Sequence, residues 1–374
     1  MVGTAKKNEK KIKYYSLSNI LKREAQYNLI IGERSNGKTY ACLKYALENY
    51  IKYGKQTAIV RRWQVDLKGR RASTLFDALI SDGTVSKLTD GEYNLIHYWS
   101  GKWYFANRDE DNGKTIYDSA KPFAYAFTLS DNEHDKSTSY PMINTVVFDE
   151  FLTRQSYLAD EFVTFMNVLS TIIRQRDDVK IFMLGNTVNK HAPYFKEMGL
   201  FRIKDMKQGT IDVYKYGDSG LKVAVEYCAS MGKVKSSAPY FAFNNPRLQM
   251  INTGAWELDI YPHLPREYKY THQDIVFQYF IEFEDNILHC EIVQKNNAVF
   301  TFIHTKTTPL KEGVEDIIFT LKNDPRPNYY VSLLRPVDEI SKQIIVFFKK
   351  EKVFYQDNEV GEIVRNYIDS LLTN

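Results

Sequence analysis

One loop motif constrains the fold of this chain more than any other feature. The pattern G-x-x-x-x-G-K-[ST], the Walker A motif, is matched without deviation at Gly32–Thr39. It follows the apolar run Tyr27–Ile31 (YNLII) and precedes Thr39–Tyr53, where apolar residues recur at helical spacing. The amides of such a loop and the helix N-terminus offer partial positive charge to a phosphate group, which the glycines let come close. The motif therefore predicts a strand, a phosphate-binding loop and a helix.

The loop also predicts individual contacts with ATP and Mg²⁺. We expect Lys38 to bridge the β- and γ-phosphates, and the hydroxyl of Thr39 to coordinate Mg²⁺. The other residues expected to contact the nucleotide are Gly32, Glu33, Arg34, Ser35, Asn36 and Gly37.

A second candidate element, a Walker B strand, is the apolar run Thr145–Phe148 (TVVF), which ends in Asp149 and Glu150. Ligands bind at the carboxyl edge of parallel sheets, where these two carboxylates are expected. Asp149 is predicted to hold Mg²⁺ through water, and Glu150 to polarise the attacking water. The second carboxylate favours ATP hydrolysis, although a solvated strand end would have the same sequence.

Three further positions extend the predicted site. Asn186 follows the strand Lys180–Leu184, where its amide would sense the γ-phosphate or simply form a turn. Arg61 and Arg62 end the strand TAIV, and are either contacts to phosphate or to a neighbouring subunit, or a solvated basic pair. Arg176 follows a predicted helix, where it would serve a neighbour's site as a catalytic arginine or only complement the helix dipole. The first interpretation of Arg176 requires a ring.

The order of strand and helix patterns predicts an α/β fold with a mostly parallel sheet, followed by a smaller α+β domain. The second domain begins with three strand patterns separated by short turns, which predict an antiparallel meander. The predicted parts are a basic flexible tail (1–13), a P-loop domain (14–230), a linker rich in proline and glycine (231–264) and a C-terminal domain (265–374).

Charge and cysteine content narrow the class of protein. The formal net charge of +4 arises in the first 13 residues, so a polyanion would have to bind local patches or this tail. The three cysteines are far apart and form no CxxC, so they indicate neither a disulfide framework nor a zinc site. No apolar run is long enough to span a bilayer, and we expect a soluble protein of a reducing cytoplasm without a membrane partner.

Several motifs together resemble a known family. IIGERSNGKTY, IVRRW, DKSTSYPMINTVVFDEF, IIRQR and LGN occur in the order and approximate spacing of the DNA-packaging ATPases of φ29-type small tailed phages. These are ASCE P-loop NTPases related to the large terminases, and the resemblance covers most of residues 14–195. It implies a homomeric, pentameric ring that docks on the portal of a prohead in the host cytoplasm and drives double-stranded DNA inward with ATP.

The resemblance gives the loop and the Asp-Glu pair the roles above and adds others. Arg176 becomes a finger acting in trans, and Lys136 matches a family lysine suspected of acting between subunits. Gln64 stands where relatives can carry a lysine, so the role of that lysine is in doubt here. For DNA phosphates, our pore-facing prediction is Lys68, Arg70 and Arg71, which equally fit an exposed charge cluster.

Terminase relatives carry an RNase H-like nuclease that needs clustered carboxylates for two metals. From Pro265 onward the chain has 13 Lys plus Arg against 17 Asp plus Glu. No carboxylate trio stands out, which argues against an active nuclease. The resemblance to the φ29-type ATPases implies instead a vestigial RNase H-like domain that docks to portal or scaffold RNA. The candidates are Glu282 and Glu284 on one strand face, with Glu291, Asp316, Asp338 and Asp369 scattered beyond.

Two alternatives stay open. A P-loop helicase or other ring ATPase would share the site but move along a free strand of nucleic acid. A small-molecule phosphotransferase would share the loop, but Glu150 and the arginine at the helix end argue against it, because a kinase excludes water.

Overall fold

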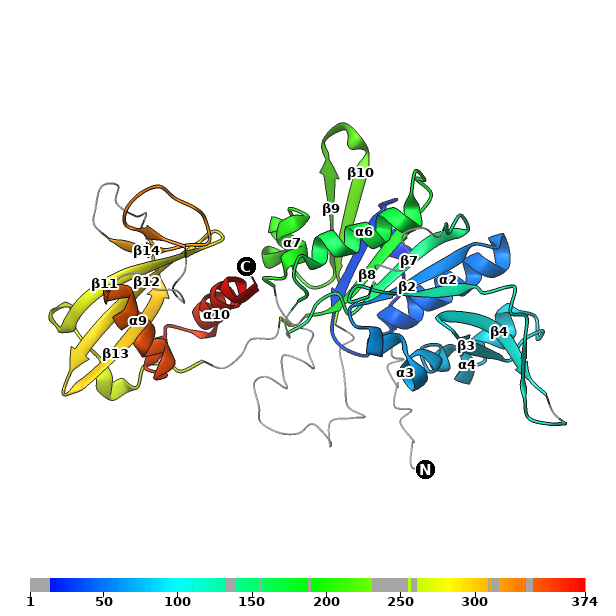
Figure 1. The fold of residues 1–374 in the computed structure, drawn as a ribbon, viewed down its shortest axis with the longest axis horizontal. Coiled ribbons are helices and arrows are strands. Elements are labelled where there is room, and N and C mark those ends of the chain that lie inside the picture. Colours follow the sequence, from blue (N-terminus) through cyan, green and yellow to red (C-terminus); the bar gives the residue numbers. More distant parts are fainter. Residues whose placement is uncertain are drawn as a thin grey trace, which may run out of the picture. The chain divides into compact units, whose positions relative to one another are not determined.

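The chain forms two compact units, Met1–Trp256 and Glu257–Asn374, each with its own sheet (Figure 1). The computed structural model describes residues 14–109, 111–131, 139–154, 157–187, 190–230, 255–256, 261–308, 310, 316–331, 333 and 339–373. The predicted tail, most of the predicted linker, Lys136 and Asp338 lie outside these residues.

Within the described residues, the first unit has a sheet of ten strands in the order β3-β4-β6-β2-β7-β8-β1-β10-β9, with β5 paired to β4. The six strands from β6 to β10 in this order are parallel to one another. They are β6 (Ala124–Thr128), β2 (Gln56–Arg61), β7 (Ile143–Asp149), β8 (Lys180–Asn186), β1 (Tyr27–Gly32) and β10 (Leu221–Tyr227). The antiparallel strands are β3 (Leu95–Trp99), β4 (Lys102–Arg108), β5 (Thr115–Tyr117) and β9 (Thr210–Tyr216).

Helices pack against both faces of this sheet. Leu29 and Ile31 of β1 belong to the core that contains Phe165 of α6 (Glu161–Ile173), whereas Ile30 belongs to the core that contains Leu43 of α2 (Lys38–Tyr53). Burial on both faces explains why these strands read as continuous apolar runs. The shorter helices are α1 (Ser18–Leu21), α3 (Gly69–Ser73), α4 (Asp77–Ser81), α5 (Thr84–Leu88) and α7 (Pro193–Glu197).

The described part of the second unit contains a six-stranded sheet in the order β15-β14-β11-β12-β13-β16. Three strands form the predicted antiparallel meander, and β14 pairs in parallel with the first of them. One sheet face packs against α10 through a core that includes Tyr279, Cys290, Ile303 and Tyr367. The elements are β11 (Ile275–Phe283), β12 (Asn286–Lys295), β13 (Ala298–Thr305), β14 (Ile317–Phe319), β15 (Tyr329–Tyr330), α9 (Glu339–Lys349), β16 (Val353–Tyr355) and α10 (Asn358–Thr373).

The fold class predicted from the sequence is confirmed: an α/β unit with a mostly parallel sheet is followed by a smaller α+β unit. Five strands of the first unit, β3, β4, β5, β9 and β10, are absent from the prediction. Of these β10 matters most, because it pairs with the strand that leads into the phosphate loop. Over the described parts of the chain, we find no helix with both the length and the apolar character needed to cross a bilayer.

Candidate nucleotide-binding site

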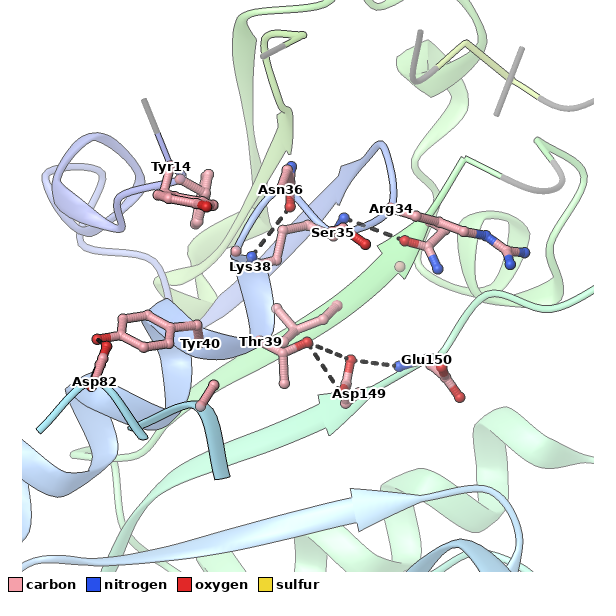
Figure 2. Close-up of a pocket in the computed structure, with 16 residues that line it drawn as sticks. Tyr14, Arg34, Ser35, Asn36, Lys38, Thr39, Tyr40, Asp82, Asp149 and Glu150 are labelled. Atoms are coloured by element: carbon pink, nitrogen blue, oxygen red, sulfur yellow. Dashed lines mark hydrogen bonds between the residues drawn. The ribbon is translucent and has the colours of Figure 1, made fainter. Parts of the chain in front are cut away.

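The loop between β1 and α2 opens onto a pocket of about 830 Å³ (Figure 2). Gly37 has a φ of 93°, in the left-handed region that glycine adopts without steric cost, and α2 starts directly after it. Asn36 supports this turn, because its Oδ1 accepts a hydrogen bond from the amide of Lys38 at 3.2 Å. The loop therefore has the strand-to-helix geometry predicted from the motif, with a volume suited to a small-molecule ligand.

Lys38 is buried at the base of the loop. Its Nζ donates to the carbonyl oxygens of Gly32 (3.3 Å) and Glu33 (2.7 Å), and to Oδ1 of Asn186 (3.4 Å). Burial lowers the pKa of this ammonium from its ordinary value. Lys38 begins α2 after the loop that follows β1, and Asn186 ends the neighbouring strand β8, so two residues predicted from separate motifs are brought together.

Thr39 and Asp149 face each other across the site. The Thr39 hydroxyl lies 3.3 Å from both carboxylate oxygens of Asp149 (Figure 2). Glu150 follows with a φ of 62°, and its side chain is 65% exposed. Its amide donates to Oδ1 of Asp149 at 3.1 Å, which fixes the turn after β7. One hydroxyl and one carboxylate form the hard oxygen donor set that suits Mg²⁺.

Arg61 bridges the two carboxylates at the end of β7. Its guanidinium lies 2.8 Å from Oδ2 of Asp149 and 2.8 Å from Oε2 of Glu150. It lines an adjoining pocket of about 470 Å³ together with Arg34 and Asn186. Arg61 therefore supplies positive charge where a metal ion would otherwise balance the carboxylates.

The structure does not support the predicted phosphate contact of Arg62. Its guanidinium forms two hydrogen bonds with the carboxylate of Glu161, at 2.7 and 2.9 Å, and both side chains are buried. It also donates to the carbonyl oxygens of Glu150 (3.2 Å) and Phe151 (2.8 Å), and stacks on Tyr157. Although burial lowers it, the contacts with Glu161 hold the pKa of Arg62 above its ordinary value. Arg62 ties the turn after β7 to the start of α6.

Arg176 lies away from the pocket of its own chain. It donates to the carbonyl oxygens of Tyr140 (3.3 Å) and Pro141 (3.1 Å), which precede β7, whereas Asp149 ends that strand. Arg176 is therefore near the amino edge of the sheet and the phosphate loop is at the carboxyl edge. Its action in a neighbouring subunit stays a prediction.

The predicted DNA-binding run lies around the start of α3, and its Arg71 also lines the smaller pocket that Arg61 and Asp149 line. Lys68, Arg70 and Arg71 are all exposed. Lys68 donates to Oε1 of Gln64 at 2.6 Å, and Arg71 pairs with Asp66 at 2.7 Å. The geometry leaves the basic run available to a partner without assigning one.

Aromatic residues near the loop were missed by the sequence analysis. Tyr14 and Tyr15 line the pocket, and the amide of Tyr15 donates to the carbonyl of Asn36 at 3.0 Å. The Tyr15 hydroxyl donates to Glu226 of β10 at 2.7 Å, and burial raises the pKa of that carboxyl. Tyr40 donates to Asp82 at 2.6 Å across the same pocket. The sequence signal for these residues was the presence of tyrosines before and after the loop motif. The motif does not specify their positions, so it could not predict that they line the pocket.

Two glycines at the site are required by close packing. A Cβ on Gly32 would lie 2.8 Å from the Cβ of Cys228, the residue after β10. A Cβ on Gly185 would lie 2.8 Å from side-chain atoms of Leu152. Real Cβ atoms do not approach this closely, so both positions admit only glycine without rearrangement of their neighbours.

A mostly parallel α/β sheet with a phosphate loop at the carboxyl end of β1 and two carboxylates at the end of β7 defines a P-loop NTPase domain. The family described as Podovirus DNA encapsidation protein (Gp16) matches residues 9–89 and 97–218, more than half of the chain. This chain belongs to that family.

Individual relatives agree with this assignment. The DNA packaging proteins of Bacillus phages phi29 and PZA are each 29% identical to this chain over 185 residues. The match covers 49% of this chain and 49% of each relative, so it spans about half the length of these proteins.

Two solved structures cover nearly the whole chain. The bacteriophage Phi-29 viral genome packaging motor assembly has a TM-score of 0.56 at 20% identity, and the Phi-28 gp11 DNA packaging motor has 0.52 at 17%. Each comparison covers 96% of this chain and 98% of the other. At these identities the likeness shows the fold, which extends through both units.

Proposed function

We propose that this chain is an ATP-driven motor that translocates double-stranded viral DNA into a phage prohead. The observation that carries the proposal is the approach of the Thr39 hydroxyl to both oxygens of Asp149, beside Lys38 and Asn186 in one pocket. This pairing unites two motifs that are 110 residues apart in sequence. Membership of the encapsidation family supports DNA as the substrate that is moved.

The residues of the pocket divide the work of ATP hydrolysis. Lys38 would exchange its bonds to the loop carbonyls for phosphate oxygens, and Thr39 with Asp149 would hold Mg²⁺, which balances the phosphate charge. Glu150, exposed beside Asp149, would polarise the attacking water once Arg61 releases its carboxylate. Asn186 would orient that water or sense the γ-phosphate through its contact with Lys38.

The assembly is proposed from the family resemblance and from the position of Arg176. Because Arg176 lies near the amino edge of the sheet, it could contact a nucleotide only in the site of another subunit. This position supports a ring, and the resemblance to the φ29-type ATPases implies five subunits. Lys136 would also act between subunits. The basic run at α3 would contact DNA phosphates in the pore, and the motor would work in the host cytoplasm at the portal vertex. The C-terminal unit would dock to portal or scaffold RNA without nuclease activity.

The hydrolytic role of Glu150 is testable with the isolated chain. Glu150→Gln should abolish ATP turnover and keep nucleotide binding, because the amide cannot polarise water but leaves the phosphate loop intact. Glu48→Gln, at an exposed position of α2 where the carboxylate pairs with Lys44, is the matched control. Full turnover in Glu150→Gln would remove this residue from the mechanism.

Two further assays test the motor and the ring. ATP-dependent uptake of DNA by matched proheads should require Lys38 and Glu150; movement along free DNA without proheads would favour the helicase alternative. Mixtures of Arg176→Ala and Glu150→Gln subunits should regain part of the ATPase activity if the arginine acts in trans. An absence of rescue at every ratio would count against the shared site.

A further inference from the structure

The second unit carries a cluster of ligating side chains remote from any motif. His289 and Glu291 lie on β12 and His304 lies on β13, where it pairs directly with His289. Since side chains alternate along a strand, these three point away from the face where Cys290 and Ile303 join the core. We searched the described parts of the chain for three or more His, Cys, Asp or Glu side chains whose ligand atoms lie close enough together to hold a metal ion. These three residues form the group that meets this criterion.

The donor atoms are already close together. Oε1 of Glu291 lies 4.0 Å from Nε2 of His289 and 3.8 Å from Nε2 of His304, and all three donors lie within 4.8 Å of one another. In a tetrahedral zinc site with bonds of about 2.1 Å, neighbouring ligand atoms are about 3.4 Å apart. The ligands would close around an ion through side-chain movements of about 1 Å, without a change of backbone register.

Neighbouring groups orient these side chains as supporting residues do at metal centres. The Tyr270 hydroxyl donates to Oε2 of Glu291, which leaves Oε1 directed at the imidazoles. Nδ1 of His304 donates to the carbonyl of Thr305 at 3.1 Å, so its Nε2 faces the cluster. A ligating histidine commonly donates its other nitrogen in this way. Phe280 stacks on His289 with ring centroids 4.9 Å apart, which restricts rotation of that ring.

Two neighbouring side chains, Gln278 and Lys306, would weaken the binding of a metal ion at this cluster. Gln278 Oε1 lies 3.2 Å from Nε2 of His289, so that contact must be exchanged for the ion. The ammonium of Lys306 lies 5.6 Å from the centre of the Phe280 ring, and its charge acts on both histidines. A simpler account of the same geometry is an ion pair between Glu291 and a protonated His304, which needs no metal.

We propose that His289, Glu291 and His304 bind a divalent transition-metal ion, Zn²⁺, with a fourth position left to water. Two imidazoles and one carboxylate are a donor set that suits zinc, whereas Mg²⁺ prefers oxygen ligands alone. The ion would tie β12 to β13 and, through Tyr270, to the segment before β11. None of the three residues lines the nucleotide pocket, and the two imidazoles distinguish the site from the carboxylate cluster of a two-metal nuclease.

Zinc binding is measured on the full chain after treatment with a chelator, by competition with a chromophoric chelator in excess Mg²⁺ so that the nucleotide site takes no zinc. We expect one equivalent of Zn²⁺. His304→Gln and Glu291→Gln should each weaken it at least about 100-fold, and Tyr270→Phe about tenfold. His272→Gln, an exposed histidine of the same unit, is the control and should bind as the parent does. Co²⁺ at this site should give visible absorption bands that His304→Gln lacks.

Weaker zinc binding in the variants above could also result from loss of folding. A variant that keeps all three metal-binding side chains avoids this ambiguity. Lys306→Met removes the opposing charge and should tighten zinc binding about twofold to fivefold. The proposal is overturned if the parent binds no zinc, if His304→Gln binds it as tightly as the parent does, or if Lys306→Met shows no tightening.

Discussion

Replacement of Arg62 by alanine separates a structural role from a role in nucleotide binding. The side chains of Arg62 and Glu161 are 7% and 1% exposed, so the substitution leaves a carboxylate buried without its cation. Removal of one partner from a buried pair costs about 3–5 kcal/mol. Glu161 keeps hydrogen bonds from the Tyr194 hydroxyl (2.8 Å) and the Leu158 amide (2.9 Å), which places the expected loss near about 3 kcal/mol.

The assay is thermal or urea unfolding of the full chain, followed through the transition of the first unit. For a domain of this size, about 3 kcal/mol corresponds to a midpoint lower by about 6–12 °C. Arg202→Ala removes a 61% exposed arginine whose pair with Asp212 spans 3.6 Å, and it should change stability by less than about 1 kcal/mol. The double variant Arg62→Met/Glu161→Leu should recover most of the loss, because no unpaired charge remains buried.

Nucleotide affinity is the second readout for Arg62→Ala. Measured on folded protein well below the midpoint, ATP binding should stay within about threefold of the parent, or about 0.7 kcal/mol. The reasoning is refuted if the midpoint is unchanged while the affinity falls by tenfold or more. Such a result would restore the phosphate contact predicted from the sequence.

Three other substitutions test particular contacts. Gly185→Ala should lower the free energy of unfolding by about 1–3 kcal/mol, because the new Cβ would clash with the buried side chain of Leu152. An unchanged urea midpoint would show that the loop after β7 can move to accommodate the Cβ. Arg61→Gln should lower the Mg²⁺ concentration for half-maximal ATPase activity about fivefold, or about 1 kcal/mol, since a competing cation is removed. A rise would instead make Arg61 a phosphate ligand. Replacement of Lys68, Arg70 and Arg71 by glutamine should reduce the slope of log affinity for DNA against log salt by up to about 2.7, and an unchanged slope would exclude them from the interface.

The nucleotide pocket was predictable because its parts are local in sequence. The loop motif has a fixed spacing, and the second motif is an apolar strand that ends in two carboxylates. Each can be recognised in the sequence without knowledge of the fold. Parallel strands then bring their carboxyl ends to one edge, so the meeting of Lys38, Thr39, Asp149 and Asn186 follows from the α/β topology alone.

Other features of the structure could not be predicted, because they depend on contacts between residues that are far apart in the sequence. Arg61 and Arg62 are adjacent and chemically identical, yet one faces the carboxylates and the other is buried against Glu161, because neighbouring residues of a strand end point to opposite faces. The histidine and glutamate cluster depends on the register between β12 and β13, which places His304 beside His289. In the sequence, only the cysteines suggested a test for a zinc site, and Glu291 was one carboxylate among several scattered ones.

The contact between Gly32 and Cys228 has a consequence for how sequences of this family can diverge. The first glycine of the phosphate loop is usually attributed to the nucleotide, but here the steric limit comes from a residue 196 positions later in the chain. Because the clash involves the Cβ atom of Cys228, exchange for alanine or serine would not relieve it, and only glycine at position 228 would make room. Positions 32 and 228 should therefore behave as an epistatic pair. A homologue with alanine at the first position is expected to carry glycine at the second, whatever ligand its loop holds.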